Sequence, residues 1–395
     1  MFVEYWGVGA ATPTSLPMTI QQVCGHLTAD WVPSLPASVS SSFVGWPPFL
    51  LQLVRVEETE FLALRGEAER SDRQWKGVLS WMLGVAGARH LLESERYRWV
   101  APLSAFYPNA TGSVDLTGWN MSFPPSSVVV DRAPGSHSRL RPDYIALRPS
   151  VPQGNAPYEW AVAEAKGTCL SLANRSLCPT DWYNQARNVK VECNRVPQPI
   201  QRHLVIATRV NPKASYPQTR RIQLRAWNSE DDPARTALPI GAAVDVVAAH
   251  LFGFFRTLHL RENARALAIS TLTRGLVRRS GIPSTEDLER AVARADEELR
   301  ERTRIREQEG AKGETVIFIE TDFGTIDVEI AAPTMTLARE LQRSRNDDTA
   351  QAALREADSQ LDRLFKTSTV RPQEAEQVRL SCGVRLLLPR DLMRL

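Results

Sequence analysis

The stretch from Arg141 to Thr168 constrains the fold of this chain most, because it contains two short apolar runs with charged residues set into them. The runs are 141–147 and 160–168. The residues between them are dense in turn formers: Pro149, Pro152, Gly154, Asn155 and Pro157. Short apolar runs on either side of such a segment are typical of two antiparallel strands joined by an irregular loop. We therefore expect a β-hairpin here.

Side-chain alternation along the second strand brings charged residues to one face. If 160–166 is extended, Glu164 and Lys166 leave one face together, and the alanines at 161, 163 and 165 leave the other. Asp143 opens the partner strand, so we expect it beside Glu164, where two carboxylates can share a divalent cation. The small alanines let a helix cover the opposite face closely. The sequence thus predicts two acids and a lysine at one point.

The order Pro142-Asp143, a spacer, then Glu164-x-Lys166 resembles the signature of the PD-(D/E)xK restriction-endonuclease-like nuclease superfamily. The resemblance implies that Asp143 and Glu164 hold Mg²⁺, with Mn²⁺ able to substitute. It also implies that the Ala165 carbonyl adds a metal ligand and that Lys166 positions the attacking water. These residue types suit that chemistry, because hard carboxylate oxygens prefer Mg²⁺ and an ammonium group beside the nucleophile favours hydroxide over water.

The flanking segments follow the order of elements in the superfamily core. Helical spacing of apolar residues predicts an opening helix over 74–93, and the valine run of 126–131 predicts the first core strand. After the hairpin, 180–189 predicts a helix with a Thr-Asp cap, and 202–208 predicts a buried strand. A further strand is expected at 221–227. The opening helix has no glutamate before Glu93, so the sequence does not place a third metal ligand.

Two more residues bear on this hypothesis. Gln185 resembles the glutamine with which some branches of the superfamily support the active site, although those branches place a tyrosine where this chain has Val189. Lys166 is one of only six lysines among 48 basic residues, and lysine, unlike arginine, has a tunable pKa. Basic residues also recur between 132 and 225, which suits phosphate contacts.

Composition sets broader limits. With 395 residues, 43% of them apolar, the chain has enough apolar side chains for two or three domains. A net charge of +3 creates no general electrostatic demand for nucleic acid. No basic N-terminal region precedes an apolar stretch, and no run reaches the apolar length of a membrane span, so we expect a cytoplasmic protein with no membrane partner.

The five cysteines are odd in number and widely spaced, which favours reduced thiols. A zinc site stays open as an alternative, although no Cys-x-x-Cys spacing supports it. Its ligands would be Cys169, Cys178, Cys193 and His203.

We expect three segments: an irregular N-terminal wrapping segment (1–60), a nuclease-like domain (61–235) and a C-terminal helical or α+β domain (240–395). The last should contain helices over 242–260, 264–279, 284–308, 335–343 and 349–365, a hairpin at 315–330 and a strand-like tail at 378–388. Ser284, with Asp287 three residues later, predicts a helix cap. The broad apolar face of the first helix, which includes Phe254 and Phe255, suggests a protein partner or homo-oligomerisation.

The preferred hypothesis is an α/β (α+β) restriction-endonuclease-like mixed sheet flanked by helices that hydrolyses DNA phosphodiesters with Mg²⁺. The resemblance further implies an effector nuclease of a bacterial antiviral defence system, in which a partner would provide the sensing, since no ATPase loop is present in the sequence. The alternative is an inactive nuclease-fold scaffold that binds nucleic acid or protein. Metal-dependent cleavage separates the two.

Overall fold

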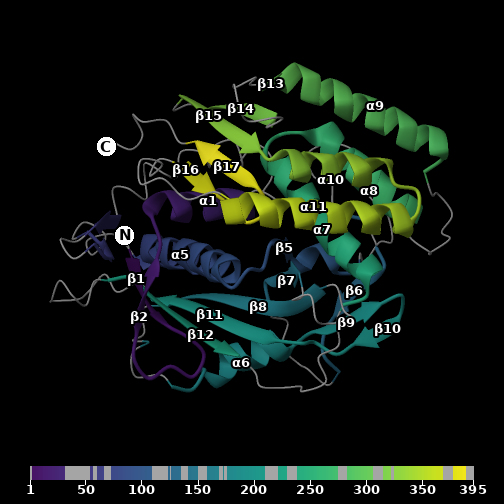
Figure 1. Cartoon of the computed structure of the whole chain (residues 1–395). Coiled ribbons are helices and arrows are strands. Elements are labelled where there is room, and N and C mark those ends of the chain that lie inside the picture. Colours follow the sequence, from purple (N-terminus) through teal and green to yellow (C-terminus); the bar gives the residue numbers. More distant parts are fainter. Residues whose placement is uncertain are drawn as a thin grey trace.

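The computed structural model of the chain, shown in Figure 1, describes residues 2–31, 54–56, 60–65, 73–108, 123–124, 126–134, 141–149, 158–168, 172, 176–209, 221–228, 238–274, 283–305, 315–321, 324–367 and 377–387. The predicted hairpin loop at 150–157, the predicted boundary at 229–237 and Cys169 lie outside these residues.

A seven-stranded mixed sheet carries the hairpin. Its strands are β1 (Phe2–Trp6), β2 (Thr14–Pro17), β5 (Trp99–Pro102), β7 (Tyr144–Pro149), β8 (Tyr158–Thr168), β11 (His203–Arg209) and β12 (Gln223–Asn228). Their spatial order is β2-β1-β12-β11-β8-β7-β5. The pairs β8–β11 and β1–β12 are parallel, and the other neighbours are antiparallel. The chain thus has the mixed α/β character that the sequence predicts.

The predicted hairpin is confirmed as β7 and β8. Tyr144 pairs with Ala163 at the open end of the ladder. Asp143 stands one residue earlier, where its backbone N–H donates to the Ala163 carbonyl at 3.0 Å. The continued register therefore places Asp143 opposite Glu164, as the sequence predicts.

Helices cover both faces of this sheet (Figure 1). The predicted opening helix is confirmed as α5 (Arg73–Ser94), which packs on β8 and β11 beside α1 (Ile20–Trp31). On the other face lies α6 (Thr180–Arg187), which follows β8 and is separated from the parallel strand β11 by two further short strands. This helix begins after Pro179 without a side-chain cap, so the predicted Thr-Asp cap is wrong. It also ends two residues before Val189.

Glycines bring the α5 backbone directly onto β8. A Cβ atom on Gly84 would lie 2.6 Å from the Gly167 nitrogen, and one on Gly167 would lie 1.8 Å from the Ser80 carbonyl oxygen. Neither position has room for a side chain, because close backbone approach requires glycine at such points. The close helix contact predicted from the alanine-lined face is confirmed, and it fixes the backbone next to Lys166.

The prediction that 126–131 forms the first strand of the main sheet is wrong. Residues 126–131 contribute β6 (Val128–Asp131), which pairs with β9 (Lys190–Cys193) and through it with β10 (Val196–Gln198) in a separate sheet. The edge position beside β7 belongs instead to β5. The valine run joins β9 because β9 and β10 form a hairpin whose turn residues, Asn194 and Arg195, both have positive φ.

The predicted irregular N-terminal segment also needs correction. Within 2–31 the chain forms β1, β2 and α1, and β1 extends the main sheet next to β12. A small two-stranded sheet follows, made of β3 (Val54–Val56) and β4 (Leu62–Leu64). The strands are short and β2 ends in a proline, so their alternation is weak in the sequence.

The C-terminal part combines helices with a five-stranded sheet of order β13-β14-β15-β17-β16. The predicted hairpin and the Ser284–Asp287 cap are confirmed. The third predicted helix ends at Arg302, earlier than expected, and β13 follows. The elements are α7 (Ile240–Thr257), α8 (Arg261–Arg274), α9 (Thr285–Arg302), β13 (Thr303–Ile305), β14 (Thr315–Thr321), β15 (Gly324–Ile330), α10 (Ala332–Arg343), α11 (Asp347–Thr367), β16 (Gln377–Arg379) and β17 (Val384–Leu387).

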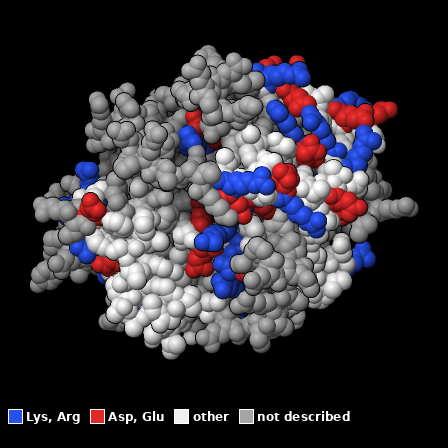
Figure 2. All heavy atoms as spheres, viewed as in Figure 1, with Lys and Arg blue, Asp and Glu red and all other residues white. Residues whose placement is uncertain are grey.

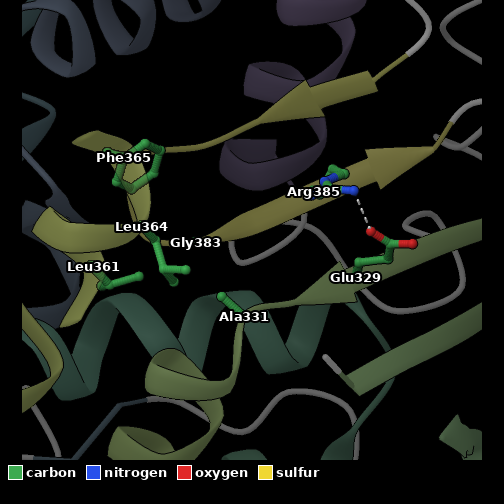
Figure 3. Close-up of a pocket in the computed structure, with 7 residues that line it drawn as sticks. All are labelled: Glu329, Ala331, Leu361, Leu364, Phe365, Gly383 and Arg385. Atoms are coloured by element: carbon green, nitrogen blue, oxygen red, sulfur yellow. Dashed lines mark ion pairs between the residues drawn. The ribbon is translucent and has the colours of Figure 1, made fainter. Parts of the chain in front are cut away.

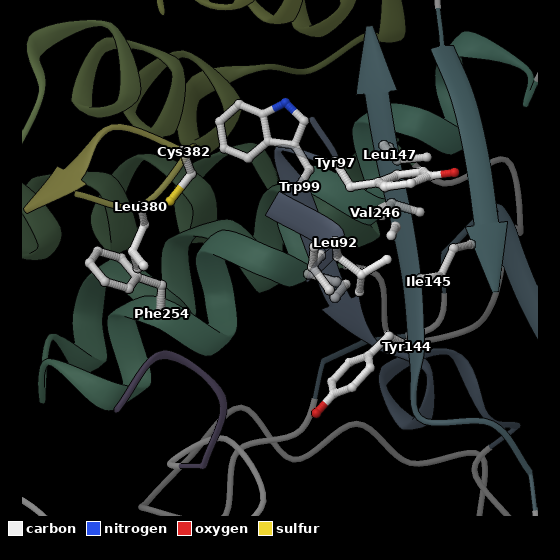
Figure 4. Packing of buried hydrophobic residues seen from close by; sticks show 14 of the residues in the cluster. Leu92, Tyr97, Trp99, Tyr144, Ile145, Leu147, Val246, Phe254, Leu380 and Cys382 are labelled. Carbon is white, nitrogen blue, oxygen red and sulfur yellow. The ribbon is translucent and has the colours of Figure 1, made fainter. Parts of the chain in front are cut away.

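The apolar face of α7 is covered within the same chain. Figure 4 shows Trp99 of β5, Leu147 of β7 and Val246 of α7 in one cluster of buried side chains. Contrary to the sequence prediction, α7 is long and apolar enough to cross a membrane by length and composition. However, 83% of the helix is buried inside the protein, as in a core helix. The division into domains and the oligomer stay predictions, and burial of this face needs no second chain.

Asp358 of α11 ties the C-terminal part to the main sheet. Its Oδ1 accepts hydrogen bonds from Arg98 Nη1 at 2.6 Å and Trp99 Nε1 at 3.1 Å, and its Oδ2 accepts one from the Tyr158 hydroxyl at 2.5 Å. Burial raises the pKa of this carboxyl, and Arg98 opposes the shift. A buried carboxylate with these partners fixes α11 against β5 and β8.

We expect Asp358→Ala to lower the free energy of unfolding by about 3 kcal/mol, because it leaves three buried donors without their acceptor. Urea denaturation measures the change. The matched control is Asp362→Ala, which removes the second acid on Arg98 from a half-exposed position and should cost less than about 1 kcal/mol. Equal effects of the two substitutions would contradict this account.

Candidate active site

The residues predicted for the site converge at the open end of the hairpin. The Ala165 N–H donates to Asp143 Oδ2 at 2.8 Å. Lys166 Nζ lies 2.6 Å from Glu164 Oε1 and donates to Gln185 Oε1 at 2.6 Å. The structure therefore brings together the residues that the sequence singles out, and their catalytic roles stay predictions.

Strand alternation decides which face carries these groups. Glu164 and Lys166 pair in parallel with Val205 and Ala207 of β11. Those two β11 residues pack in the small apolar cluster that includes Ala186 of α6. Glu164 and Lys166 therefore lie on the α6 face of the sheet, because paired residues of neighbouring strands share a face. The opposite, alanine-lined face is the one that α5 covers.

Gln185 ties this face to the start of β7. The residue is buried on α6, and its Nε2 donates to the Arg141 carbonyl at 3.0 Å while its Oε1 accepts from Lys166. Both ends of the amide are thereby used, which fixes its orientation. One side chain therefore sets the position of Lys166 relative to Arg141.

Glu164 is the electrostatic centre of the site. Its side chain is 1% exposed. Burial raises its pKa from 4.5 to about 8, the charge of Asp143 acts in the same direction, and Lys166 opposes both. Without a cation, burial and Asp143 favour the protonated form of Glu164, and the ion pair with Lys166 favours its carboxylate.

The donor set fits Mg²⁺. Glu164 Oε2 is buried and has no hydrogen-bond partner, which leaves an acceptor available for a cation. The described residues contain no group of three or more His, Cys, Asp or Glu side chains suited to a metal. Two carboxylates are nevertheless a usual protein contribution to Mg²⁺, which keeps several waters and takes further oxygens from phosphate. Asp143 and Glu164 would hold the ion.

The Ala165 carbonyl is also well placed for its predicted role. In an extended strand the N–H and C=O of one residue point to the same side. Because the Ala165 N–H points at Asp143, the Ala165 carbonyl faces the side of that carboxylate, beyond the last pair between β7 and β8. It would add a third oxygen ligand.

Tyr107 is a site residue that the sequence does not reveal. It follows the short 3-10 helix η3 (Leu103–Phe106), and the Leu103 N–H donates to the Asp143 carbonyl at 2.8 Å, which brings this segment to the site. Its ring lies under the Arg141 guanidinium, 4.0 Å from Cζ to the ring centroid. Burial raises the Tyr107 pKa, Arg141 lowers it, and Asp143 and Glu164 raise it. Tyr107 can be recognised as a site residue only from its contacts in the folded protein.

Several of the recurring basic residues have structural partners instead of facing a ligand. Arg148 contacts Glu159, Lys190 contacts Glu192, and Arg202 contacts Glu95. Arg221 contacts Glu4. On the face shown in Figure 2, basic and acidic residues are interspersed. The predicted density of arginines therefore reflects ion pairing as much as any phosphate surface.

The alternative zinc site gains no support in the described part of the chain. Cys178 and Cys193 have free thiols, and burial raises the pKa of each to about 12. The described residues also hold no group of three potential ligands that would include His203.

A pocket lies elsewhere, between the C-terminal sheet and α11 (Figure 3). Glu329 and Arg385 form an ion pair 3.0 Å apart on one side of it, and Leu361, Leu364 and Phe365 form an apolar wall. This lining offers no paired acids and no catalytic lysine. We therefore place the candidate active site at the hairpin and not at this pocket.

Comparison of the chain with family models, with curated proteins and with solved structures found no match. The function of the chain is therefore inferred from the geometry at Asp143, Glu164, Lys166 and Gln185.

We expect Gln185→Ala to slow DNA cleavage by about 10- to 100-fold without abolishing it, because Gln185 holds Lys166 but contacts no reacting atom. A timed cleavage assay measures the rate. Asn184→Ala, an exposed neighbour on the same helix, is the matched control and should leave the rate unchanged. A folded Gln185→Ala protein with no activity at all would mean that the amide acts directly on substrate or metal.

Proposed function

We propose that this chain is a Mg²⁺-dependent nuclease that hydrolyses DNA phosphodiesters. The observation that carries the proposal is Glu164, a buried carboxyl with one unpartnered oxygen, opposite Asp143 and beside a lysine held by a glutamine. A buried carboxyl such as Glu164 with a second acid beside it is costly unless a cation or a proton neutralises it. A purely structural ion pair has no use for the second carboxylate.

Each side chain has a distinct task in the proposed reaction. Asp143 and Glu164 hold the cation, which when bound supplies a Lewis acid for the phosphoryl oxygens. Lys166 donates a hydrogen bond to the attacking water and stabilises the hydroxide form of the nucleophile. Gln185 keeps the Lys166 ammonium in place. The water oxygen forms a new P–O bond, one ester P–O bond breaks, and the proton of the water reaches the leaving alcohol through solvent.

The element order supports the superfamily assignment without establishing it. An opening helix (α5) precedes three antiparallel strands in sheet order β5-β7-β8, and α6 precedes β11, parallel to β8, once the strands β6, β9 and β10 of the separate sheet are set aside. This is the order of helix, strands, helix and strand that the resemblance implies. A cytoplasmic role as a defence effector is part of the same proposal, and its only support is the resemblance to the superfamily.

A cleavage assay on the full chain tests the proposal. Supercoiled plasmid, linear duplex and single-stranded DNA are incubated with the protein in Mg²⁺, Mn²⁺ or EDTA. We expect cleavage with either metal and none with EDTA. Absence of cleavage of every substrate in both metals would favour the scaffold alternative, and cleavage that persists in EDTA would remove the metal from the mechanism.

A further inference from the structure

Arg141 has unused hydrogen-bond donors close to the acid pair. Its Nη1 is buried and has no hydrogen-bond partner, and its Nη2 lies 3.7 Å from Asp131 Oδ1, beyond hydrogen-bond distance. The Asp131 side chain is 65% exposed, so water screens that contact strongly. A buried guanidinium nitrogen without an acceptor is unfavourable, because its N–H groups have left water without gaining a hydrogen bond in the protein. Arg141 therefore keeps one buried donor nitrogen, Nη1, that no acceptor occupies.

The guanidinium is nevertheless held in place. Its plane is supported by the Tyr107 ring, 4.0 Å from Cζ to the ring centroid. Its backbone carbonyl accepts from Gln185 Nε2 at 3.0 Å, and Pro142 follows it in the chain. A stacked arginine keeps its N–H groups in the plane of the guanidinium, where they match the oxygens of a phosphate. Arg141 is thus prepared to bind an anion beside Asp143.

Arg148, on the same hairpin, shows what a structural arginine looks like in this protein. It also lies over a tyrosine, with Cζ 5.0 Å from the Tyr97 ring centroid. Its Nε donates to Glu159 at 2.9 Å, its Nη2 contacts the same carboxylate, and its Nη1 donates to the Glu95 carbonyl at 3.1 Å. Every nitrogen of Arg148 has an acceptor. The two arginines differ in their acceptors and not in their stacking.

We propose that Arg141 binds an oxygen of the nucleic-acid phosphodiester next to Asp143 and Glu164, and that Tyr107 is the positioning residue that holds its guanidinium. This inference rests on the proposed nuclease function and extends it to the substrate contact. Lys166 is less suited to that contact, because its ammonium is shared between Glu164 and Gln185. Arg141 would anchor the strand while Lys166 acts on water.

Binding measured across salt concentrations tests this contact without using cleavage. A fluorescein-labelled DNA duplex is titrated with the full chain by anisotropy, with Ca²⁺ in place of Mg²⁺. Loss of one phosphate contact lowers the slope of log Kd against log salt by about 0.9. We expect Arg141→Ala to weaken binding and to lower the slope by about that amount. Arg141→Lys keeps the charge, so the slope should stay while affinity falls.

Further variants separate contact from packing. Tyr107→Leu should weaken binding severalfold with little change in slope, because Arg141 remains charged, and Tyr107→Phe should restore binding because it keeps the ring. Arg148→Ala is the matched control and should leave the slope unchanged. Mn²⁺ calorimetry verifies that Asp143 and Glu164 still bind metal in each variant. If Arg141→Ala does not fold, Arg141→Gln replaces it.

The outcomes distinguish this inference from the proposed function. A wild-type slope in the folded Arg141→Ala or Arg141→Gln protein would overturn the Arg141 contact and leave the nuclease intact. Wild-type binding with no cleavage in Mg²⁺ or Mn²⁺ would remove the nuclease proposal, and the slopes would still decide the role of Arg141. A wild-type chain that does not bind DNA would overturn both.

Discussion

If the proposed function holds, Asp143→Asn and Glu164→Gln are each expected to abolish DNA cleavage, with a loss of at least roughly 10³-fold, because several kcal/mol of transition-state stabilisation would depend on the metal that these acids are proposed to hold. Both substitutions keep size and shape. The amide oxygen of Asn can still accept from the Ala165 N–H, which in the wild type donates to Asp143. Plasmid cleavage measures activity, and Mn²⁺ calorimetry should show loss of binding in both variants.

Glu159→Gln is the matched control for these substitutions. Glu159 lies on the same strand as Glu164, and its carboxylate contacts Arg148 at the other end of the hairpin. The control should cleave at the wild-type rate, provided that it folds. Wild-type rates in both Asp143→Asn and Glu164→Gln would remove the acid pair from the mechanism, whatever the fold.

Glu164→Gln should also change how stability depends on pH, and this effect can be measured without any cleavage assay. Burial and the Asp143 charge raise the pKa of Glu164 from 4.5 to about 8, so the folded state binds this proton more tightly than the unfolded state. The resulting stability is complete below about pH 4.5 and is lost as pH rises through about 8. A glutamine at this position does not titrate.

Glu164→Gln should therefore be more stable than wild type at alkaline pH in EDTA, by on the order of 4 kcal/mol, and the difference should vanish at acidic pH. Urea denaturation at several pH values measures it. Adding Mn²⁺ should stabilise the wild type at alkaline pH and leave Glu164→Gln nearly unchanged, because the ion replaces the proton on the carboxylate. Equal stability of the two proteins at every pH would contradict the raised pKa of the buried Glu164 carboxyl.

Local patterns were sufficient to predict the hairpin and its acid pair. Alternation places Glu164 and Lys166 on one face, and an antiparallel partner that begins at Asp143 brings the acids together. Both rules act over a few residues and need no knowledge of the rest of the fold. Gln185 was accessible only through resemblance, because its contact with Lys166 requires the packing of α6 on the sheet.

The errors arose where pairing over long distances decides the structure. The valine run of 126–131 resembles a core strand, yet its partner is β9, which belongs to a hairpin that the sequence did not indicate. The strand that does flank β7 is four residues long and ends in Pro102, so its own signal is weak. Tyr107 lies at the site because it comes shortly after this strand in the chain, so the sequence could not place it there without the strand.

The glycines of α5 carry information that periodicity does not. In the sequence, Gly84 reads as an unfavourable residue inside an amphipathic helix. In the structure it is the point at which the helix backbone meets β8, directly behind Lys166. The cost in helix propensity is therefore offset by a rigid backbone at the site. This rigidity bears on how Lys166 can be replaced.

Lys166→Arg is expected to be nearly as inactive in DNA cleavage as Lys166→Ala. The Lys166 ammonium lies 2.6 Å from both Glu164 Oε1 and Gln185 Oε1, which leaves little room for a longer, planar guanidinium. The β8 backbone has little space behind it, because α5 approaches so closely at Gly84 that a Cβ added there would lie 2.8 Å from the Lys166 carbonyl carbon. Arginine keeps the charge, so any loss reports geometry.

Lys190→Arg is the matched control, because Lys190 also forms an ion pair, 2.5 Å from Glu192, at a half-exposed position. An ordinary pair of this kind tolerates arginine with a change in stability within about 1 kcal/mol. Cleavage rates, urea denaturation and Mn²⁺ calorimetry are compared for the three variants. Metal binding by Asp143 and Glu164 should persist in both Lys166 variants. Wild-type cleavage by Lys166→Arg would leave the metal site in place but exclude a specific role for lysine. If Lys166→Arg loses cleavage and Lys190→Arg does not, the compact ammonium of Lys166 is required for the reaction.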